Sequence, residues 1–81
     1  MKWALIFFLL NSHTGEYMES FYAQVFETKE ECEHYLYKLN EKGPNSNSIT
    51  YNLKRDEVGN LTLIEDNNIF RFIRACTLLR L

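Results

Sequence analysis

The sequence predicts an α+β fold, with a single sheet of about five strands and one helix packed on one face, in the order β-β-α-β-β-β. The chain has 81 residues, which is the size of one domain. Residues 3–10 are apolar at every position, as in a strand that is covered on both faces. Only residues 28–42 show the apolar spacing of an amphipathic helix. We therefore treat residues 1–81 as a single domain.

The composition is that of an ordered globular protein, with 46% hydrophobic and 25% charged residues but only three Gly and one Pro. Aromatic residues make up 15% of the chain, which is more than so small a core can enclose. Some of them should be partly exposed, where aromatic side chains favour contacts between proteins. The net charge of −2 is too weak and of the wrong sign to attract nucleic acid phosphates by itself.

The first strand, WALIFFLL over residues 3–10, needs cover on both faces, and one helix shields only one face. The second cover should be another copy of the protein or another macromolecule. Lys2 followed by apolar residues also resembles a secretory signal, but no small-x-small cleavage site follows. A membrane span needs about 20 apolar residues, so we interpret the segment as a buried strand and expect no membrane contact.

Residues 11–16 form a turn-rich stretch of hairpin-loop length, and residues 17–26 return as a second extended segment. We expect the two segments to pair antiparallel. Strict alternation divides the second segment into two faces, with Phe21, Ala23 and Val25 on one and Tyr22, Gln24 and Phe26 on the other.

The helix has clear start and stop signals. Thr28 and Glu31 have the spacing of a capping box, in which the Thr28 hydroxyl accepts from the Glu31 N–H and the Glu31 carboxylate accepts from the Thr28 N–H. Gly43-Pro44 ends the helix, Gly as its cap and Pro because it cannot continue. The apolar positions form one stripe: Cys32, Tyr35, Leu36 and Leu39.

Turns rich in Gly, Asn and Asp separate three further strands, which cover residues 49–54, 61–65 and 69–81. The first and last strands should be central in the sheet because they are the most apolar. Arg71, Arg74 and Arg80 interrupt the last strand on both faces, as expected near a sheet edge or the rim of an interface.

The sequence contains no motif for a cofactor, a phosphate or a metal, and no catalytic set converges. His13 falls in a loop and His34 on the polar side of the helix, and neither has an evident partner as a metal ligand. Cys32 and His34 are two residues apart on a helix and therefore point in roughly opposite directions. We expect no enzymatic activity, no cofactor and no metal.

Cys32 and Cys76 are the two cysteines of the chain. Cys32 lies on the helix stripe that faces the sheet and Cys76 lies in the last strand, so the two can approach each other between helix and sheet. A disulfide requires Cα atoms within about 7 Å and suitably directed Cβ atoms. In the cytosol two reduced, buried thiols are the rule, and we predict that state, with a disulfide as the alternative.

Several of these features occur together in one group of proteins: Met1-Lys2-Trp3 opening an all-apolar strand, Phe26, Thr28 and Cys32 at the helix start, and Cys76 in the last strand. In this pattern the chain resembles small single-domain proteins encoded by tailed phages, including those of marine cyanobacteria, and by some bacteria. The resemblance covers about the first 40 residues and the last dozen, while residues 56–68 make a longer excursion than the pattern has. It implies a phage or bacterial origin, and a location in the cytoplasm of the host cell if the protein is phage-encoded. It assigns no activity.

We predict a small non-enzymatic interaction protein that self-associates through its sheet as a homodimer and that has a host protein as a further candidate partner. Tyr37 should be exposed on the helix, opposite the apolar stripe, in a position suited to contacts. The candidate interface combines residues of the first strand, this tyrosine and residues of the last strand: Trp3, Leu5, Phe7, Leu9, Tyr37, Phe70, Phe72, Arg71 and Arg74.

The alternative is a module that binds single-stranded nucleic acid, because several such modules combine aromatic side chains on a sheet with nearby Arg. The residues that would form this surface are Phe70, Phe72, Arg71, Arg74, Arg80, Lys54 and Arg55. The competing interpretation places the two Phe in the core and makes the Arg residues solubilising. Given the negative net charge, nucleic acid is the less favoured partner.

Overall fold

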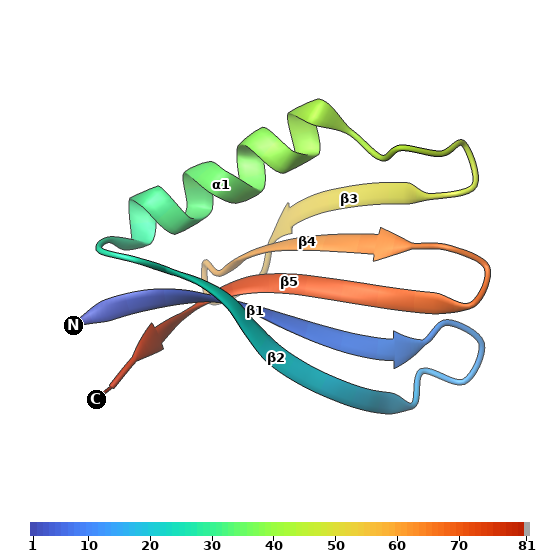
Figure 1. Ribbon diagram of the computed structural model, residues 1–81, viewed down its shortest axis with the longest axis horizontal. Coiled ribbons are helices and arrows are strands. Elements are labelled where there is room, and N and C mark those ends of the chain that lie inside the picture. The colour runs from blue at the N-terminus through green and yellow to red at the C-terminus, as the bar shows by residue number, and fades with distance from the viewer. Residues whose placement is uncertain (81) are drawn as a thin grey trace.

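The computed structural model describes residues 1–80, which form five strands and one helix (Figure 1). The elements are β1 (Lys2–Asn11), β2 (Tyr17–Phe26), α1 (Lys29–Lys42), β3 (Thr50–Arg55), β4 (Leu61–Asp66) and β5 (Phe70–Leu79). The predicted α+β class and the order β-β-α-β-β-β are confirmed. The prediction extends the last strand to Leu81, which lies outside the described residues.

The five strands form one antiparallel sheet in the order β2-β1-β5-β4-β3, with β2 and β3 at the edges. β1 and β5 are both internal, as predicted from their apolar sequences. They pair without interruption from Lys2 opposite Leu79 to Asn11 opposite Phe70. In Figure 1 these two strands run side by side through the sheet, and α1 lies above one face.

The caps of α1 form at the predicted residues. The Thr28 hydroxyl accepts from the N–H of Glu31 at 3.1 Å, and it donates to the Glu31 carboxylate at 3.3 Å. The Glu31 carboxylate therefore accepts a hydrogen bond from the side chain of Thr28, whereas the sequence pattern predicted one from the backbone N–H of Thr28. Gly43 has a φ of 77° and its N–H donates to the Leu39 carbonyl oxygen at 3.1 Å, which stops the helix.

The core lies between α1 and one face of the sheet. Residues that stand opposite each other in paired strands point to the same face, so Leu5 and its partner Cys76 both point toward the helix. The fully buried members of the core are Leu5, Cys32, Leu36, Leu61 and Leu63. Two of these five side chains come from the helix and three from the sheet, so neither layer has a core without the other.

A disulfide joins Cys32 of α1 to Cys76 of β5, with Cα atoms 6.1 Å apart. The prediction of two reduced thiols is therefore wrong. It followed from the cytosolic location, whereas a bridge depends on the distance and direction of the two side chains, which the sequence does not give.

Strand β2 departs from strict alternation. Its pairing with β1 shifts register between Leu5 and Ile6 and again between Leu9 and Leu10. Each shift leaves one extra residue in β2, which is the geometry of a β-bulge, and the predicted faces of this strand are wrong for that reason. The true faces mix the two predicted sets, with Phe21, Gln24 and Phe26 on the helix side and Tyr22 and Val25 on the other.

Arg71 and Arg74 lie in the central strand of the sheet, so of the two predicted positions, a sheet edge or the rim of an interface, the edge is wrong. Arg71 Nε lies 2.7 Å from Asp66 Oδ1, and Arg74 Nη1 lies 2.9 Å from Glu65 Oε1. Both carboxylates belong to the neighbouring strand β4. Opposite charges paired across strands make the central position tolerable.

Candidate interaction surface

The sheet has a broad surface on the side away from α1, which we call the open face. Even-numbered residues of β1 point to it, because odd-numbered ones such as Leu5 point into the core. The register then defines an apolar area across four strands, and we call these residues the open-face patch: Ile6, Phe8, Leu10, Tyr22, Val25, Ile64, Ile73 and Ala75.

Cross-strand pairs make the open-face patch continuous. Phe8 pairs with Ile73, and Ile73 pairs with Ile64, so three large apolar side chains stand next to one another across β1, β5 and β4. The adjacent row reaches the edge strand and consists of Tyr22, Ile6 and Ala75. The Tyr22 side is the most accessible, with 62% of this residue exposed.

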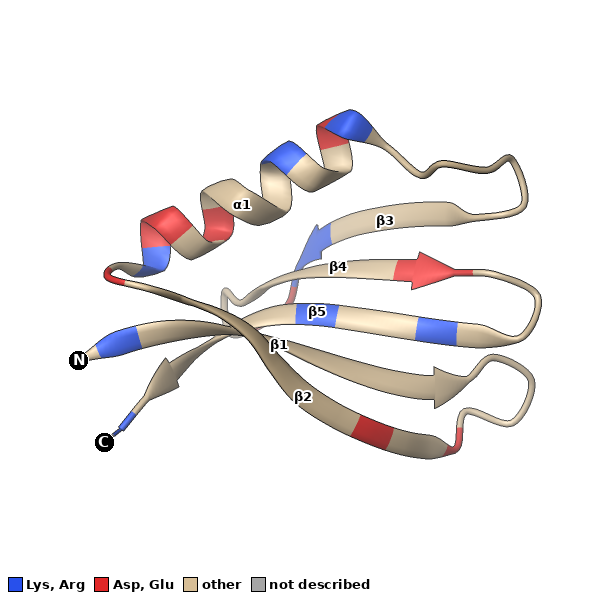
Figure 2. Ribbon diagram, in the orientation of Figure 1, with Lys and Arg blue, Asp and Glu red and all other residues tan. Residues whose placement is uncertain are grey.

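Charges lie around the open-face patch rather than within it. Arg71 and Asp66 form an ion pair at the border of the patch. The hydrogen bond to Asp66, and secondly the negative charge of Asp66, raise the pKa of the Arg71 guanidinium. Lys2 pairs with Glu27, and the hydrogen bond from Lys2 lowers the pKa of that carboxyl. Figure 2 shows β1 without charge beyond its start. The patch is thus an apolar area bordered by charges that compensate each other.

Both edges of the sheet carry features that oppose pairing with another strand. β3 is only six residues long and ends in Lys54 and Arg55. β2 is ten residues long, but it has two bulges and an exposed Glu19. Short strands, charged side chains and bulges are common protections of sheet edges, so a partner finds its contacts more readily on a face than on an edge.

The predicted interface residues divide between the two faces of the sheet. Arg71 points to the open face, and Tyr37 lies on α1. The others point to the helix side: Trp3, Leu5, Phe7, Leu9, Phe70, Phe72 and Arg74. Leu5 is 1% exposed and belongs to the core, so its inclusion in an interface is wrong.

The residues of the open-face patch were missed because a strand that is apolar at every position does not show which alternate set faces the helix. The cysteines carried part of the missing information. If Cys76 faces the helix stripe, then Ile73 and Ala75 face away from it. The register between β1 and β5 then assigns Ile6 and Phe8 to the same open face, and the sequence does not specify that register.

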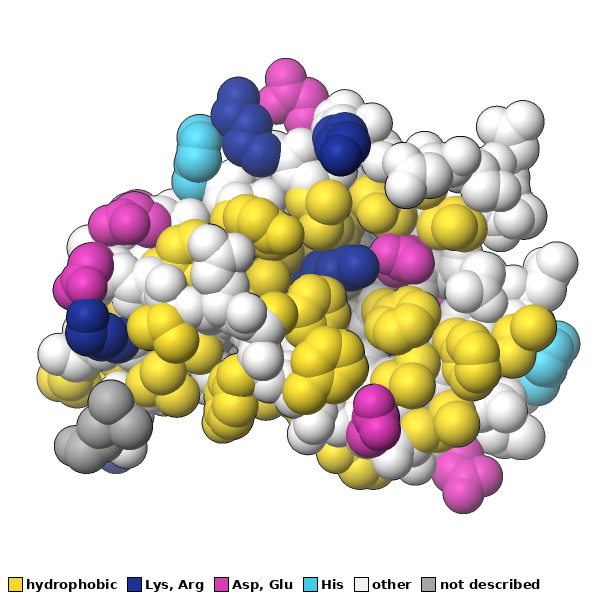
Figure 3. Space-filling view, in the orientation of Figure 1, with side chains coloured by type: hydrophobic (Ala, Val, Ile, Leu, Met, Phe, Trp, Pro, Cys, Tyr) yellow, Lys and Arg dark blue, Asp and Glu magenta, His cyan; other side chains and the backbone are white. Residues whose placement is uncertain are grey.

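A second apolar area lies on the helix side, where α1 rises away from the sheet toward its C-terminal end (Figure 1). Figure 3 shows hydrophobic side chains gathered below the helix around a basic and an acidic group. Aromatic rings on this side already contact one another. Phe7 stacks on Phe21 with ring centroids 5.0 Å apart, and the centroids of Phe70 and Phe72 are 6.5 Å apart.

Arg74 and Glu65 form a largely buried ion pair on this side, with 15% and 14% of their side chains exposed. The approach of Arg74 Nη1 to the carboxylate lacks the angles of a hydrogen bond. The guanidinium also lies 4.9 Å from the centre of the Phe7 ring, within cation–π distance. The pKa of the neighbouring Tyr51 is raised mainly by burial and to a lesser extent by the nearby charge of Glu65. Arg74 is therefore held within the protein by the charge of Glu65 and the ring of Phe7.

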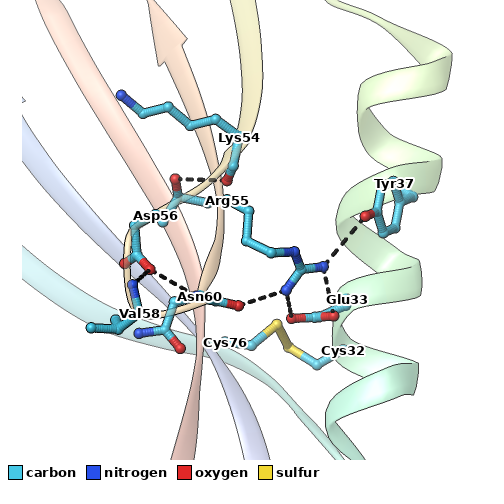
Figure 4. A network of polar contacts seen from close by, with 11 residues as sticks. Cys32, Glu33, Tyr37, Lys54, Arg55, Asp56, Val58, Asn60 and Cys76 are labelled. Atoms are coloured by element: carbon cyan, nitrogen blue, oxygen red, sulfur yellow. Dashed lines mark hydrogen bonds and ion pairs between the residues drawn. A yellow bond between two sulfur atoms is a disulfide. The ribbon is translucent and has the colours of Figure 1, made fainter.

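A polar clamp joins α1 to the turn between β3 and β4 (Figure 4). Arg55 donates to both carboxylate oxygens of Glu33 at 3.2 Å, to the carbonyl oxygen of Gly59 at 2.6 Å and to the hydroxyl of Tyr37 at 3.4 Å. Hydrogen bonding to Glu33 raises the pKa of the Arg55 guanidinium. Tyr37 is exposed, as predicted, and its hydroxyl also holds Arg55.

The residues of the nucleic-acid alternative do not share one surface. Phe72 and Arg74 point to the helix side, whereas Arg71 and Lys54 point to the open face. Moreover, Arg55, Arg71 and Arg74 are each paired with a carboxylate. A phosphate would have to compete with these partners.

Comparison of the chain with protein-family models, with curated proteins and with solved structures found no match. Within residues 1–80, no helix combines the length and the apolar character needed to cross a membrane. Across the same residues, no group of three or more His, Cys, Asp or Glu side chains is arranged to hold a metal ion.

Proposed function

We propose that the protein is a non-enzymatic interaction protein that forms a homodimer by packing the open-face patches of two copies against each other. The observation that carries this proposal is the continuous apolar area over β2, β1, β5 and β4 on the side that α1 leaves uncovered. Large apolar side chains gain roughly 1.5–3 kcal/mol each on full burial. A partner that covers this area supplies the second cover that β1 needs.

The size of the open face suits a sheet-to-sheet contact. Four strands spaced by about 4.8 Å, each with about nine residues rising by about 3.3 Å, span a projected area of roughly 570 Å². Side chains add relief to this area, which brings it near the roughly 800 Å² of accessible surface that one partner contributes to a standard interface. Two such sheets pack about 10 Å apart with their strands turned by about 30°.

A second copy is the partner that best fits the chemistry of this face. The patch is apolar, and its bordering charges pair within the same chain, so it presents no charge that would select a partner of opposite sign. Around a two-fold axis the patch meets itself, which matches apolar with apolar surface. A host protein is the further partner proposed for a phage-encoded chain.

The cytoplasmic location and the phage or bacterial origin stay predictions. The disulfide weighs against a reducing cytosol, where such bonds are rare.

Tyr22 and Phe21 offer a matched test, because they are neighbours on the edge strand, both exposed, and point to opposite faces. Light scattering after size-exclusion chromatography should give twice the 9.7 kDa mass of the chain for the wild type. Tyr22→Lys and the more central Ile73→Lys should shift the protein toward the monomer, because each buries a charge in the interface. Phe21→Lys should leave the dimer intact.

Two results would contradict the proposal. One is a wild-type monomer at high micromolar concentration. The other is dissociation by Phe21→Lys but not by Tyr22→Lys, which would place the contact on the helix side. Circular dichroism of each variant distinguishes loss of the dimer from loss of the fold.

A further inference from the structure

One covalent bond joins α1 to the sheet. Cys32 lies in the second turn of α1 and Cys76 in the central strand β5, and their disulfide closes a loop with a sequence separation of 44 residues. Cys32 is fully buried and belongs to the core with Leu36, so the bond also forms part of the apolar layer. The covalent link and the packing of the helix are thus one feature.

Other contacts also hold the helix: Leu39 packs against the core, the Tyr35 ring centroid lies 5.9 Å from that of Phe26, and Lys29 Nζ lies 5.6 Å from the centre of the Trp3 ring. The buried residues of α1 are Cys32 and Leu36 alone. Outside the core, a clamp of hydrogen bonds from Arg55 to Glu33 and Tyr37 links the helix to the end of β3. Its ion pair is partly exposed, with 43% of the Arg55 side chain and 15% of the Glu33 side chain accessible, so solvent screens part of its contribution to stability. A chain of this size also has a small margin between folded and unfolded states.

We propose that the Cys32–Cys76 bond is a redox latch, so that the fold exists in an oxidising environment and opens when a dithiol reduces the bond. The chain-entropy model predicts that a disulfide closing a loop of this length raises the folding equilibrium constant by roughly a thousandfold. Without it, the side chains of Cys32, Leu36 and Leu39 and the surface contacts of α1 must hold the helix against the entropy of the free chain. If the helix detaches, the core is lost, because the sheet supplies only the side chains of one of its two layers.

The latch opens by thiol–disulfide exchange with a dithiol as the reductant. One thiolate of the reductant attacks the sulfur of Cys76 and displaces Cys32 as a thiolate. The second thiolate of the reductant then attacks the mixed disulfide, forms the reductant's own disulfide and releases Cys76. Two electrons pass to the protein, and both of its sulfurs end as thiols after taking up one proton each.

The two cysteine residues differ in accessibility. Cys32 is 0% exposed, whereas Cys76 keeps part of its surface. The attacking thiolate therefore reaches Cys76 first. Trapping with the monothiol glutathione, followed by alkylation and peptide mapping, should find the glutathione adduct on Cys76 and the alkyl group on Cys32. The reverse assignment would overturn this order of attack.

The latch itself is tested by denaturation and amide hydrogen exchange of the full chain with and without dithiothreitol. Reduction should lower the folding constant of the wild type by roughly a thousandfold and remove the protection of amides in α1. The Cys32→Ala/Cys76→Ala double variant should behave like the reduced protein and show no response to dithiothreitol. Equal midpoints and equal α1 protection in oxidised and reduced wild type would overturn the proposal.

This outcome is independent of the proposed dimer. Amide hydrogen exchange in α1 reports on the helix side of the sheet. The oligomeric state is tested separately, by substitutions on the open face. A monomeric protein whose helix loses protection on reduction would refute the dimer and support the latch.

Discussion

Arg74 shows how a charged residue is accommodated in the most apolar region of this protein. It lies in the central strand, with its side chain mostly buried, between the carboxylate of Glu65 and the ring of Phe7. An ion taken out of water is costly unless a counter-ion compensates it. The two partners together keep Arg74 on the helix side without a free charge.

This arrangement predicts an asymmetry between single and double substitutions. Glu65→Leu alone should lower the free energy of unfolding by about 3 kcal/mol, because it leaves the Arg74 guanidinium uncompensated. Glu65→Leu combined with Arg74→Met should cost less than the single substitution, since apolar pairs often replace buried ion pairs without loss. Urea denaturation measures both variants, and a double variant that is less stable than Glu65→Leu alone would mean that the pair is not coupled.

Tyr51 should make stability depend on alkaline pH. Its pKa is raised in the folded protein, chiefly by burial, so the unfolded chain loses the phenolic proton at a lower pH, near 10. The folded state then binds more protons than the unfolded state, and stability falls as the pH rises through this range. Below this pH range Tyr51 is protonated in both states, and its contribution to stability is fully present. Tyr51→Phe should reduce the alkaline decline in the midpoint of denaturation, and identical slopes for the two proteins would contradict this assignment.

At the scale of elements, α1 was predictable because its signals are local. The cap at Thr28, the apolar stripe and Gly43 all act within a few residues. The structure reproduces the cap, the stop at Gly43 and the burial of Cys32 and Leu36, whereas Tyr35 of the predicted stripe is 37% exposed. The faces of β2 were not predictable, because its two bulges arise from pairing with β1 rather than from its own sequence. The disulfide depended in the same way on where α1 crosses β5.

The contributions of the helix cap and of the buried helix face to stability can be compared within α1. Thr28→Ala should lower the free energy of unfolding by about 1 kcal/mol, because the Glu31 N–H loses its acceptor. Leu36→Ala should lower it by about 2–5 kcal/mol, because it leaves a cavity in the core. Chemical denaturation ranks the two variants. If Thr28→Ala lowered the free energy of unfolding more than Leu36→Ala, the helix would be held by its first turn rather than by its buried face.

At the scale of the whole molecule, the class and the element order follow from the sequence, while the exposed face of the sheet does not. An apolar first strand correctly indicates that both faces need cover. It leaves undetermined whether Phe7 or Phe8 points away from the helix, since this depends on pairing with β5. The candidate site was therefore predictable as a sheet face but not as a set of residues.

The distribution of charge over the molecule argues against nucleic acid as a partner. Fluorescence anisotropy with single-stranded oligonucleotides should show no binding at physiological salt, because the arginines are paired and face both sides of the sheet. Reversing the charge of Lys54 serves as a check, since it has no paired carboxylate among the ion pairs of the open face. Micromolar binding that weakens in this variant would support the alternative.

The uninterrupted pairing of β1 with β5 has a consequence for synthesis on the ribosome. β1 emerges before the other strands of this sheet, yet one of its two neighbours, residues 70–79, is made only after β2, α1, β3 and β4. Contacts between such distant parts of a chain form slowly, and unpaired apolar strands attract other chains. Until residues 70–79 are made, we therefore expect the nascent β1–β2 hairpin to have an unpaired inner edge and two uncovered faces, which exposes the growing chain to aggregation.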